Sequence, residues 1–105
     1  MFLGKLGDGK EEKIIEGVTR RLLTTGEKIQ VFMLEMKGGT PVPEHSHPHE
    51  QAGYIIQGVF EVNIGGQKGI LKKDGCFRIP SNTPHSGYVH EDTFLLDVYS
   101  PPRSE

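Results

Sequence analysis

Short apolar segments separated by glycine and proline run the length of the chain, and none keeps the 3.6-residue period of an amphipathic helix. Fourteen glycines and seven prolines among 105 residues favour short strands joined by turns. Residues 14–23 predict one or two strands interrupted at Gly17, followed by a turn at residues 24–27. Residues 29–36 are apolar at odd and even positions alike, which predicts a strand covered on both faces and ended by residues 37–39.

Alternation with a period of two is clearest in the second half of the chain. Phe60, Val62 and Ile64 share one face of a strand over residues 59–64, and Gly65-Gly66 supplies the positive-φ positions of a hairpin turn. The remaining predicted elements are a returning strand, a turn and two further strands, at residues 69–73, 73–75, 76–80 and 93–99.

The last of these strands has two different faces. One face carries Phe94, Leu96 and Val98, and the other carries Leu95, Asp97 and Tyr99. Eight or more short strands with glycine turns predict an all-β fold, a two-sheet jelly roll or barrel that hides its strand edges by wrapping around. No repeat, linker or low-complexity segment marks a second domain, so residues 1–105 are expected to form a single domain.

The composition narrows the classes of partner. Lysine and arginine are scattered and the net charge is −2, so we expect no nucleic-acid partner. No segment approaches a membrane-spanning length, and residues 1–13 lack the apolar run and cleavage site of a secretory signal. Cys76 is the only cysteine, which excludes an internal disulfide and fits a reducing cytoplasm. We therefore expect a cytoplasmic protein with a small-molecule partner.

Three of the five histidines fall within residues 45–49, and two of them have a metal-ligand spacing. His45 and His47 are two residues apart, so on an extended strand their rings point to the same side, about 7 Å apart along the backbone. One metal ion can bridge that gap. Gln51 has the same parity and Glu50 the opposite one, so the amide faces the imidazoles unless a turn at Pro48 changes the pattern.

A further imidazole is available at His85, in a turn framed by Pro80 and Pro84 just before another apolar strand. The alternative is that these are surface histidines in a proline-rich loop, but their spacing favours metal binding. His49 and His90 are expected to be polar loop residues rather than ligands. Imidazole ligands admit Ni, Zn, Fe, Co or Mn, and the pattern does not choose among these divalent ions.

A second group of candidate residues lies at the carboxyl end of the chain. Asp97 stands in a strand whose other residues are almost all apolar, so it must pair, bind, shift its pKa upward, or face solvent from an outer sheet. Tyr99 is either part of the site or a packing aromatic. Arg103 follows two prolines and either forks onto a carboxylate or belongs to a solvated tail.

The first cluster resembles the first motif of the cupin superfamily, here residues 39–58. That motif has a glycine, a His-x-His pair, a glutamate and a final glycine, and it is matched by Gly39, His45, His47 and Gly58 with Gln51 at the glutamate position. The resemblance implies a jelly-roll β-barrel fold. It also implies that Gln51 replaces an anionic ligand by a neutral one.

The second motif, residues 75–89, is met at Gly75, Pro80 and His85. Asn82 stands in place of a glycine and Val89 in place of the final asparagine. The two motifs together span residues 39–89, about half of the chain. With three imidazoles and one amide oxygen, a divalent ion keeps its full +2 charge, which makes it a stronger Lewis acid with affinity for an anionic ligand.

Residues 45–51, 79–85 and 97–103 together resemble the small single-domain cupins of pectin degradation, the KdgF type. Proteins of that type convert cyclic 4,5-unsaturated uronates, released by pectate or alginate lyases, to the linear keto form. The resemblance implies that one divalent metal ion is held by His45, His47, Gln51 and His85. It implies substrate or proton-transfer roles for Asp97, Tyr99 and Arg103, although phenylalanine is common in the family where Tyr99 stands.

This resemblance predicts a metal-dependent enzyme acting on a small anionic sugar acid, and a homodimer is usual among such proteins. One rival is a metal-dependent cupin dioxygenase, which needs a redox-active metal and an open position for oxygen. The other is a cupin that binds sugar acids without catalysis. Oxygen uptake tied to turnover distinguishes the first rival, and tight binding without turnover distinguishes the second.

Overall fold

The computed structural model describes residues 2–103 of the chain and is built almost entirely from strands. A short 3-10 helix, η1 (Leu6–Asp8), precedes eight strands in the described residues, β1 (Glu11–Ile15), β2 (Val18–Thr25), β3 (Gln30–Met36), β4 (Pro41–His45), β5 (Glu50–Ile64), β6 (Gln67–Leu71), β7 (Cys76–Ile79) and β8 (His85–Ser100). The prediction of an all-β fold is confirmed. Between residues 2 and 103, no helix has the length and apolar character needed to cross a membrane.

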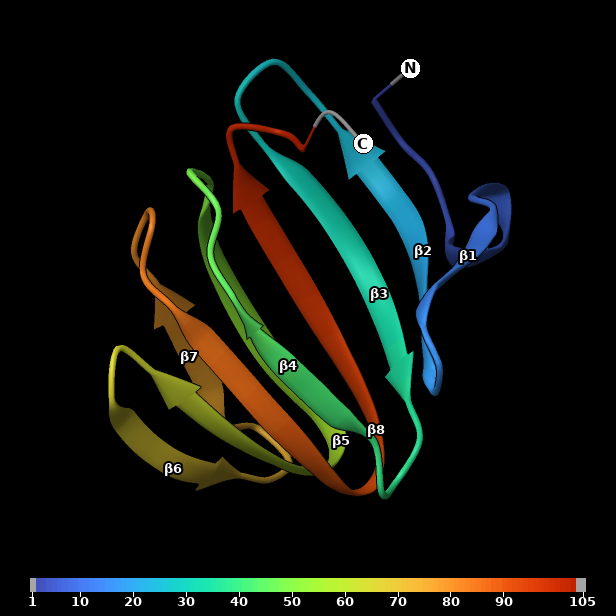
Figure 1. Cartoon of the computed structure of the whole chain (residues 1–105). Helices are drawn as coiled ribbons and strands as arrows, with labels where there is room; N and C mark the ends of the chain where they lie inside the picture. Colours follow the sequence, from blue (N-terminus) through green and yellow to red (C-terminus); the bar gives the residue numbers. More distant parts are fainter. Residues whose placement is uncertain (1, 104–105) are drawn as a thin grey trace.

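The two long strands β5 and β8 form the centre of the sheet. They pair antiparallel along nearly their whole length, from Glu50 opposite Ser100 to Ile64 opposite His85. Strand β8 also pairs with β3 through its second half and with β4 through its first, while β5 also pairs with β7 and β6. Figure 1 shows β2 and β3 on one side of β8 and β4 to β7 on the other.

The path of paired strands runs β1-β2-β3-β8-β5-β6, with β4 added to β8 and β7 to β5. No described pairing joins the ends of this path, so the sheet is curved but not closed. The described strands form one antiparallel eight-stranded sheet, so the predicted all-β class is observed, whereas neither the two separate sheets of a jelly roll nor closure into a barrel is observed.

Several predicted strand ends are wrong, because β5 begins at Glu50 rather than at residue 59, β8 begins at His85 rather than at residue 93, and β6 covers Gln67–Leu71 rather than residues 69–73. Gly17, with φ of 89°, separates β1 from β2 as predicted, but β2 continues through Thr25. Ile29 lies outside β3 and is 50% exposed, because Gly26 donates its N–H to the Ile29 carbonyl at 2.7 Å and keeps it in the turn. The strand is also not buried evenly on both faces, since its even positions bury more than its odd ones.

The inner face of the sheet carries the core. Its buried cluster consists of Val18, Met36, Ile55, Phe60, Val62, Val89 and Leu95. In β8 the pleat places Thr93, Leu95, Asp97 and Tyr99 on this inner face, all buried. Asp97 is only 3% exposed, so the alternative in which it faces solvent is wrong.

Two glycines of the first motif have backbones that other residues rarely adopt. Gly39 has φ of 89° and Gly58 has φ of 121°. At Gly58 a Cβ atom would also lie 2.5 Å from the Cα of Thr93. The predicted hairpin turn at Gly65-Gly66 has φ values of 57° and 91°. These positions therefore hold glycine for steric reasons as well as for the turns they make.

Candidate metal centre and pocket

Three histidines from separate segments meet at one end of the inner face. His45 ends β4 and His85 begins β8, and the antiparallel register places these two residues opposite one another. His47 lies in the connection between β4 and β5. One ring nitrogen from each histidine lies within 4.8 Å of the others, and the ring centroids of His45 and His85 are 4.1 Å apart. This cluster can hold a metal ion.

Backbone carbonyls determine which nitrogen each ring offers. The Nδ1 atoms of His45, His47 and His85 lie 2.9, 2.9 and 2.8 Å from the carbonyls of Pro43, His49 and Thr83. A carbonyl oxygen only accepts, so each Nδ1 must carry the proton. The lone pair of each neutral ring is then on Nε2, the arrangement that metal-binding histidines share.

Gln51 brings an amide oxygen next to the histidine cluster, and Asp97 sets the orientation of this amide. The Gln51 Nε2 group donates to Asp97 Oδ1 at 2.9 Å, which turns the amide oxygen toward His47, where Oε1 lies 3.1 Å from Nε2. With the His47 tautomer given above, both of these atoms are acceptors. Two lone pairs facing each other at this distance form an arrangement that a bound cation satisfies.

The fit to a cation is strengthened by His85. Its Nε2 is buried and has no hydrogen-bond partner among the described residues. Burial lowers the pKa of both His47 and His85, and the positive charge of Arg103 lowers them further. Neutral rings with unshared lone pairs are the form that binds divalent ions such as zinc or nickel. The donor set therefore suits a metal.

Asp97 lies next to this centre in a low-dielectric environment. Burial raises the pKa of its carboxyl to about 6, against the opposing effects of hydrogen bonds from Gln51 and Tyr99 and the charges of Arg103 and Arg20. The Tyr99 hydroxyl donates to Asp97 Oδ2 at 3.4 Å, and burial raises the pKa of Tyr99 as well. Asp97 can therefore exchange a proton near neutral pH.

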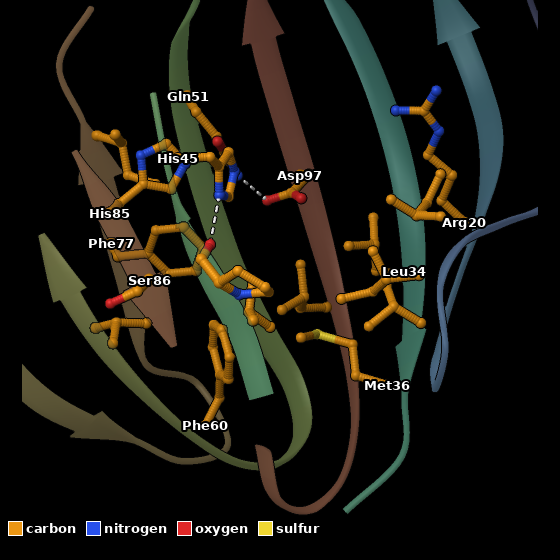
Figure 2. Close-up of a pocket in the computed structure, with 18 of the residues that line it drawn as sticks. Arg20, Leu34, Met36, His45, Gln51, Phe60, Phe77, His85, Ser86 and Asp97 are labelled. Atoms are coloured by element: carbon orange, nitrogen blue, oxygen red, sulfur yellow. Dashed lines mark hydrogen bonds between the residues drawn. The ribbon is translucent and has the colours of Figure 1, made fainter. Parts of the chain in front are cut away.

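A cavity of about 360 Å³ opens beside the three histidines and extends over the apolar inner face. Figure 2 shows His45, His85 and Gln51 gathered at one wall, Asp97 beside them, and Met36 and Phe60 below. Such a mixture of an apolar lining and a few convergent polar groups is typical of small-molecule sites.

The C-terminal segment packs over this cavity up to Arg103. The alternative in which Arg103 belongs to a solvated tail is therefore wrong. The Arg103 backbone N–H donates to Gln30 Oε1 at 2.9 Å, and its guanidinium lies 5.1 Å from the centre of the Tyr99 ring. His49 also holds the segment, because its Nδ1 donates to the Pro101 carbonyl at 3.0 Å.

The structure brings all the predicted site residues together. His45, Gln51, His85, Asp97, Tyr99 and Arg103 line the cavity, and His47 belongs to the histidine cluster. His90 lies within β8 rather than in a loop, apart from the cavity, and contacts Glu61 at 2.8 Å. Sequence reasoning missed Arg20, which also lines the cavity. Arg20 alternates in step with the apolar residues Val18 and Leu22, which indicates that it faces inward. The adjacent Arg21 makes this alternation hard to recognise.

Comparisons with known proteins agree with this geometry. The model of the Cupin domain family matches residues 32–99. The chain is 29% identical over 96 residues to the pectin degradation protein KdgF of Dickeya dadantii (strain 3937). The aligned region covers 90% of this chain and 87% of that protein.

Two solved structures superpose on nearly the whole chain. KdgF from Halomonas sp. does so with a TM-score of 0.89 and 26% identity, covering 96% of this chain and 94% of that one. An RmlC-like cupin from Shewanella frigidimarina NCIMB 400 has a TM-score of 0.92 and 24% identity, covering 99% and 94%. The second likeness concerns the fold alone.

Proposed function

We propose that this chain, which belongs to the cupin domain family, is a metal-dependent enzyme that converts cyclic 4,5-unsaturated uronates to their linear keto form. The observation that carries the proposal is that one cavity combines the histidine cluster, the Gln51–Asp97 pair and Arg103. The similarity to KdgF proteins along most of the chain supports a place in pectin degradation.

In this proposal His45, His47, Gln51 and His85 hold one divalent metal ion. When bound, such an ion supplies Lewis acidity and an affinity for carboxylate oxygen that its neutral ligands leave undiminished. Asp97 holds the Gln51 amide so that its oxygen faces the histidines. This hydrogen bond orients the Gln51 amide, which is a neutral metal ligand and is not drawn to the ion by a charge of its own.

Arg103 and Asp97 act on the substrate. The Arg103 guanidinium binds the substrate carboxylate through paired hydrogen bonds. Ring opening at C1 leaves an enol, with its hydroxyl on C5 and its double bond between C4 and C5. Asp97 passes a proton to C4, and the C5 hydroxyl loses one, so the enol becomes a ketone with no net change in oxidation state. Tyr99 donates to Asp97 and keeps its carboxyl in position.

The direct test follows an ultraviolet spectrum. Metal-loaded protein is added to unsaturated monouronate freshly made by a pectate or alginate lyase, and loss of the conjugated absorbance is compared with the spontaneous rate. We expect a rate well above that of buffer containing the same free metal. Oxygen consumption matching the lost absorbance would instead indicate a dioxygenase, and tight binding without a rate increase would indicate a binding protein.

For the assembly we propose a homodimer formed through the outer face of β3, β8 and β5. The pairing registers place Met33, Leu96 and Tyr54 in one row across these strands. Nearby Phe94 and Ile56 are 39% and 36% exposed, so further apolar side chains accompany this row on the outer face. Light scattering is expected to give twice the chain mass, and Phe94→Glu to give a monomer. A monomeric parent protein would refute the dimer.

A further inference from the structure

Arg20 places a second guanidinium on the wall of the cavity that faces the histidine cluster. Its side chain is only 11% exposed, and it lines the same cavity as Gln51 and Arg103. Figure 2 shows Asp97 between Gln51 on one side and Arg20 on the other. The proposed metal and Arg20 are therefore on opposite sides of the residue that the mechanism uses for proton transfer.

The two arginines of the cavity rest on adjoining aromatic rings. The Arg20 guanidinium carbon lies 4.4 Å from the centre of the Phe32 ring, and that of Arg103 lies 5.1 Å from the centre of the Tyr99 ring. The two rings pack edge to face with centres 5.9 Å apart. Stacking holds a guanidinium plane in place while its N–H donors remain directed within that plane, which suits it to bind oxygen atoms of a ligand.

A purely structural role for Arg20 is the main alternative. Its Nε–H donates to Glu12 at 2.8 Å and so ties β2 to β1. However, the next residue already makes this connection on the outer face, because Arg21 donates to the Gly9 carbonyl at 2.7 Å and to Glu11 at 3.3 Å. The Arg20 side chain is 11% exposed, whereas that of Glu12 is 53% exposed, so the guanidinium reaches into the cavity wall while its carboxylate partner stays at the surface. A guanidinium placed in this way is suited to bind oxygen atoms of a ligand in the cavity.

We propose that Arg20 forms a second oxyanion subsite, which binds the oxygens of a six-carbon sugar acid at the end away from its first carboxylate. The proposal rests on the proposed function for the placement of that first carboxylate at Arg103 and the metal. It adds that the cavity recognises the substrate at both ends. A six-carbon acid with a carboxylate at each end is then the ligand that this arrangement binds most tightly.

The test uses glucarate, glucuronate and glucose, which carry two, one and no carboxylates on the same carbon chain. Isothermal titration calorimetry on the metal-loaded protein is expected to give the affinity order glucarate, glucuronate, glucose, with metal content checked after each titration. Arg20→Met keeps the aliphatic stem and removes the charge. We expect it to weaken glucarate binding by about ten- to hundredfold, the usual effect of losing a charge-assisted hydrogen bond, and to abolish the preference for glucarate over glucuronate.

Two matched variants separate recognition from structure. Arg21→Met removes the neighbouring guanidinium and its link to β1, and is expected to leave the preference for glucarate intact. Glu12→Gln removes the carboxylate that neutralises Arg20, and is expected to tighten glucarate binding. Equal weakening by Arg20→Met and Glu12→Gln would show that the ion pair is only structural and would overturn the proposal.

A parent protein that does not prefer glucarate, or a preference that survives Arg20→Met, would also overturn it. The readout is binding, so the proposed function is tested separately. If unsaturated monouronate is not converted but the glucarate preference depends on Arg20, the proposed reaction fails while the second subsite remains.

Discussion

Replacing Asp97 by asparagine tests whether this residue is a buried carboxyl that exchanges a proton. The substitution keeps the size of the side chain, and its Oδ1 can still accept from Gln51 Nε2. What it removes is the ability to ionise. The two roles of Asp97, in stability and in catalysis, then give separate measurements on one variant.

The effect on stability follows from the pKa of Asp97. Burial raises this pKa from 3.8 to about 6 in the folded protein. Between pH 3.8 and about pH 6 the folded state binds more protons than the unfolded state, so the free energy of unfolding falls as pH rises. The full destabilisation by the ionised, buried carboxylate is present above about pH 6. A shift of about two units corresponds to about 3 kcal/mol, so metal-free Asp97→Asn is expected to be more stable than the parent at pH 8 by up to about this amount.

The assay is urea unfolding in a chelator between pH 3.5 and 8. The stability difference between Asp97→Asn and the parent should grow as pH rises through the interval from 4 to 6. Glu35→Gln removes an exposed carboxylate from the neighbouring strand β3 and serves as the control for the loss of one charge. A difference that does not change with pH, or that shrinks as pH rises, would refute the buried-carboxyl argument.

The catalytic measurement uses the metal-loaded protein. Asp97→Asn is expected to retain the fold and the metal, while turnover of unsaturated monouronate falls by roughly 10²-fold or more, the usual contribution of a general acid or base. Unchanged turnover with metal confirmed would leave Asp97 as a residue that only positions Gln51.

Three further outcomes are expected. His47→Ala should lose the metal, because one of three imidazoles is removed; elemental analysis of protein never exposed to a nickel column measures this, and full occupancy would exclude His47 as a ligand. Gln51→Glu should retain the metal but reduce the rate at least about tenfold. The new carboxylate would face the carboxyl of Asp97 at hydrogen-bond distance and would lower the positive charge of the metal centre. A rate equal to that of the parent protein would contradict this reasoning. Gly58→Ala should destabilise the fold by about 2 kcal/mol or more, because of its positive φ and the close approach of Thr93; Gly69→Ala, where a Cβ meets nothing within 4 Å, is the control in thermal unfolding.

Local pattern predicted an all-β chain and the direction of several side chains, although it placed the starts of β5 and β8 nine and eight residues too late. The period of two in residues 93–99 placed Asp97 on the same face as Leu95, and both are buried. The same parity rule put Gln51 rather than Glu50 on the side of the histidines, and Gln51 is the buried one, although residues 46–49 are not strand and a bend at Pro48 separates β4 from β5. The direction of Asp97 depends on the pleat of a single strand, which neighbouring residues determine.

Other features depend on pairing between distant segments. His85 joins His45 because β4 pairs with the first half of β8, and the pattern within either segment does not specify that register. Arg103 reaches the cavity through a bond to Gln30, 73 residues earlier.

The sequence by itself therefore determined the all-β class, the candidate ligands and the inward direction of Asp97, because these follow from side-chain chemistry and a strand period. Only the tertiary structure decided that the sheet stays open, that Ile29 leaves β3, and that Arg20 faces the same cavity as Arg103. Each of these depends on which strands lie side by side, and that is a property of the whole chain.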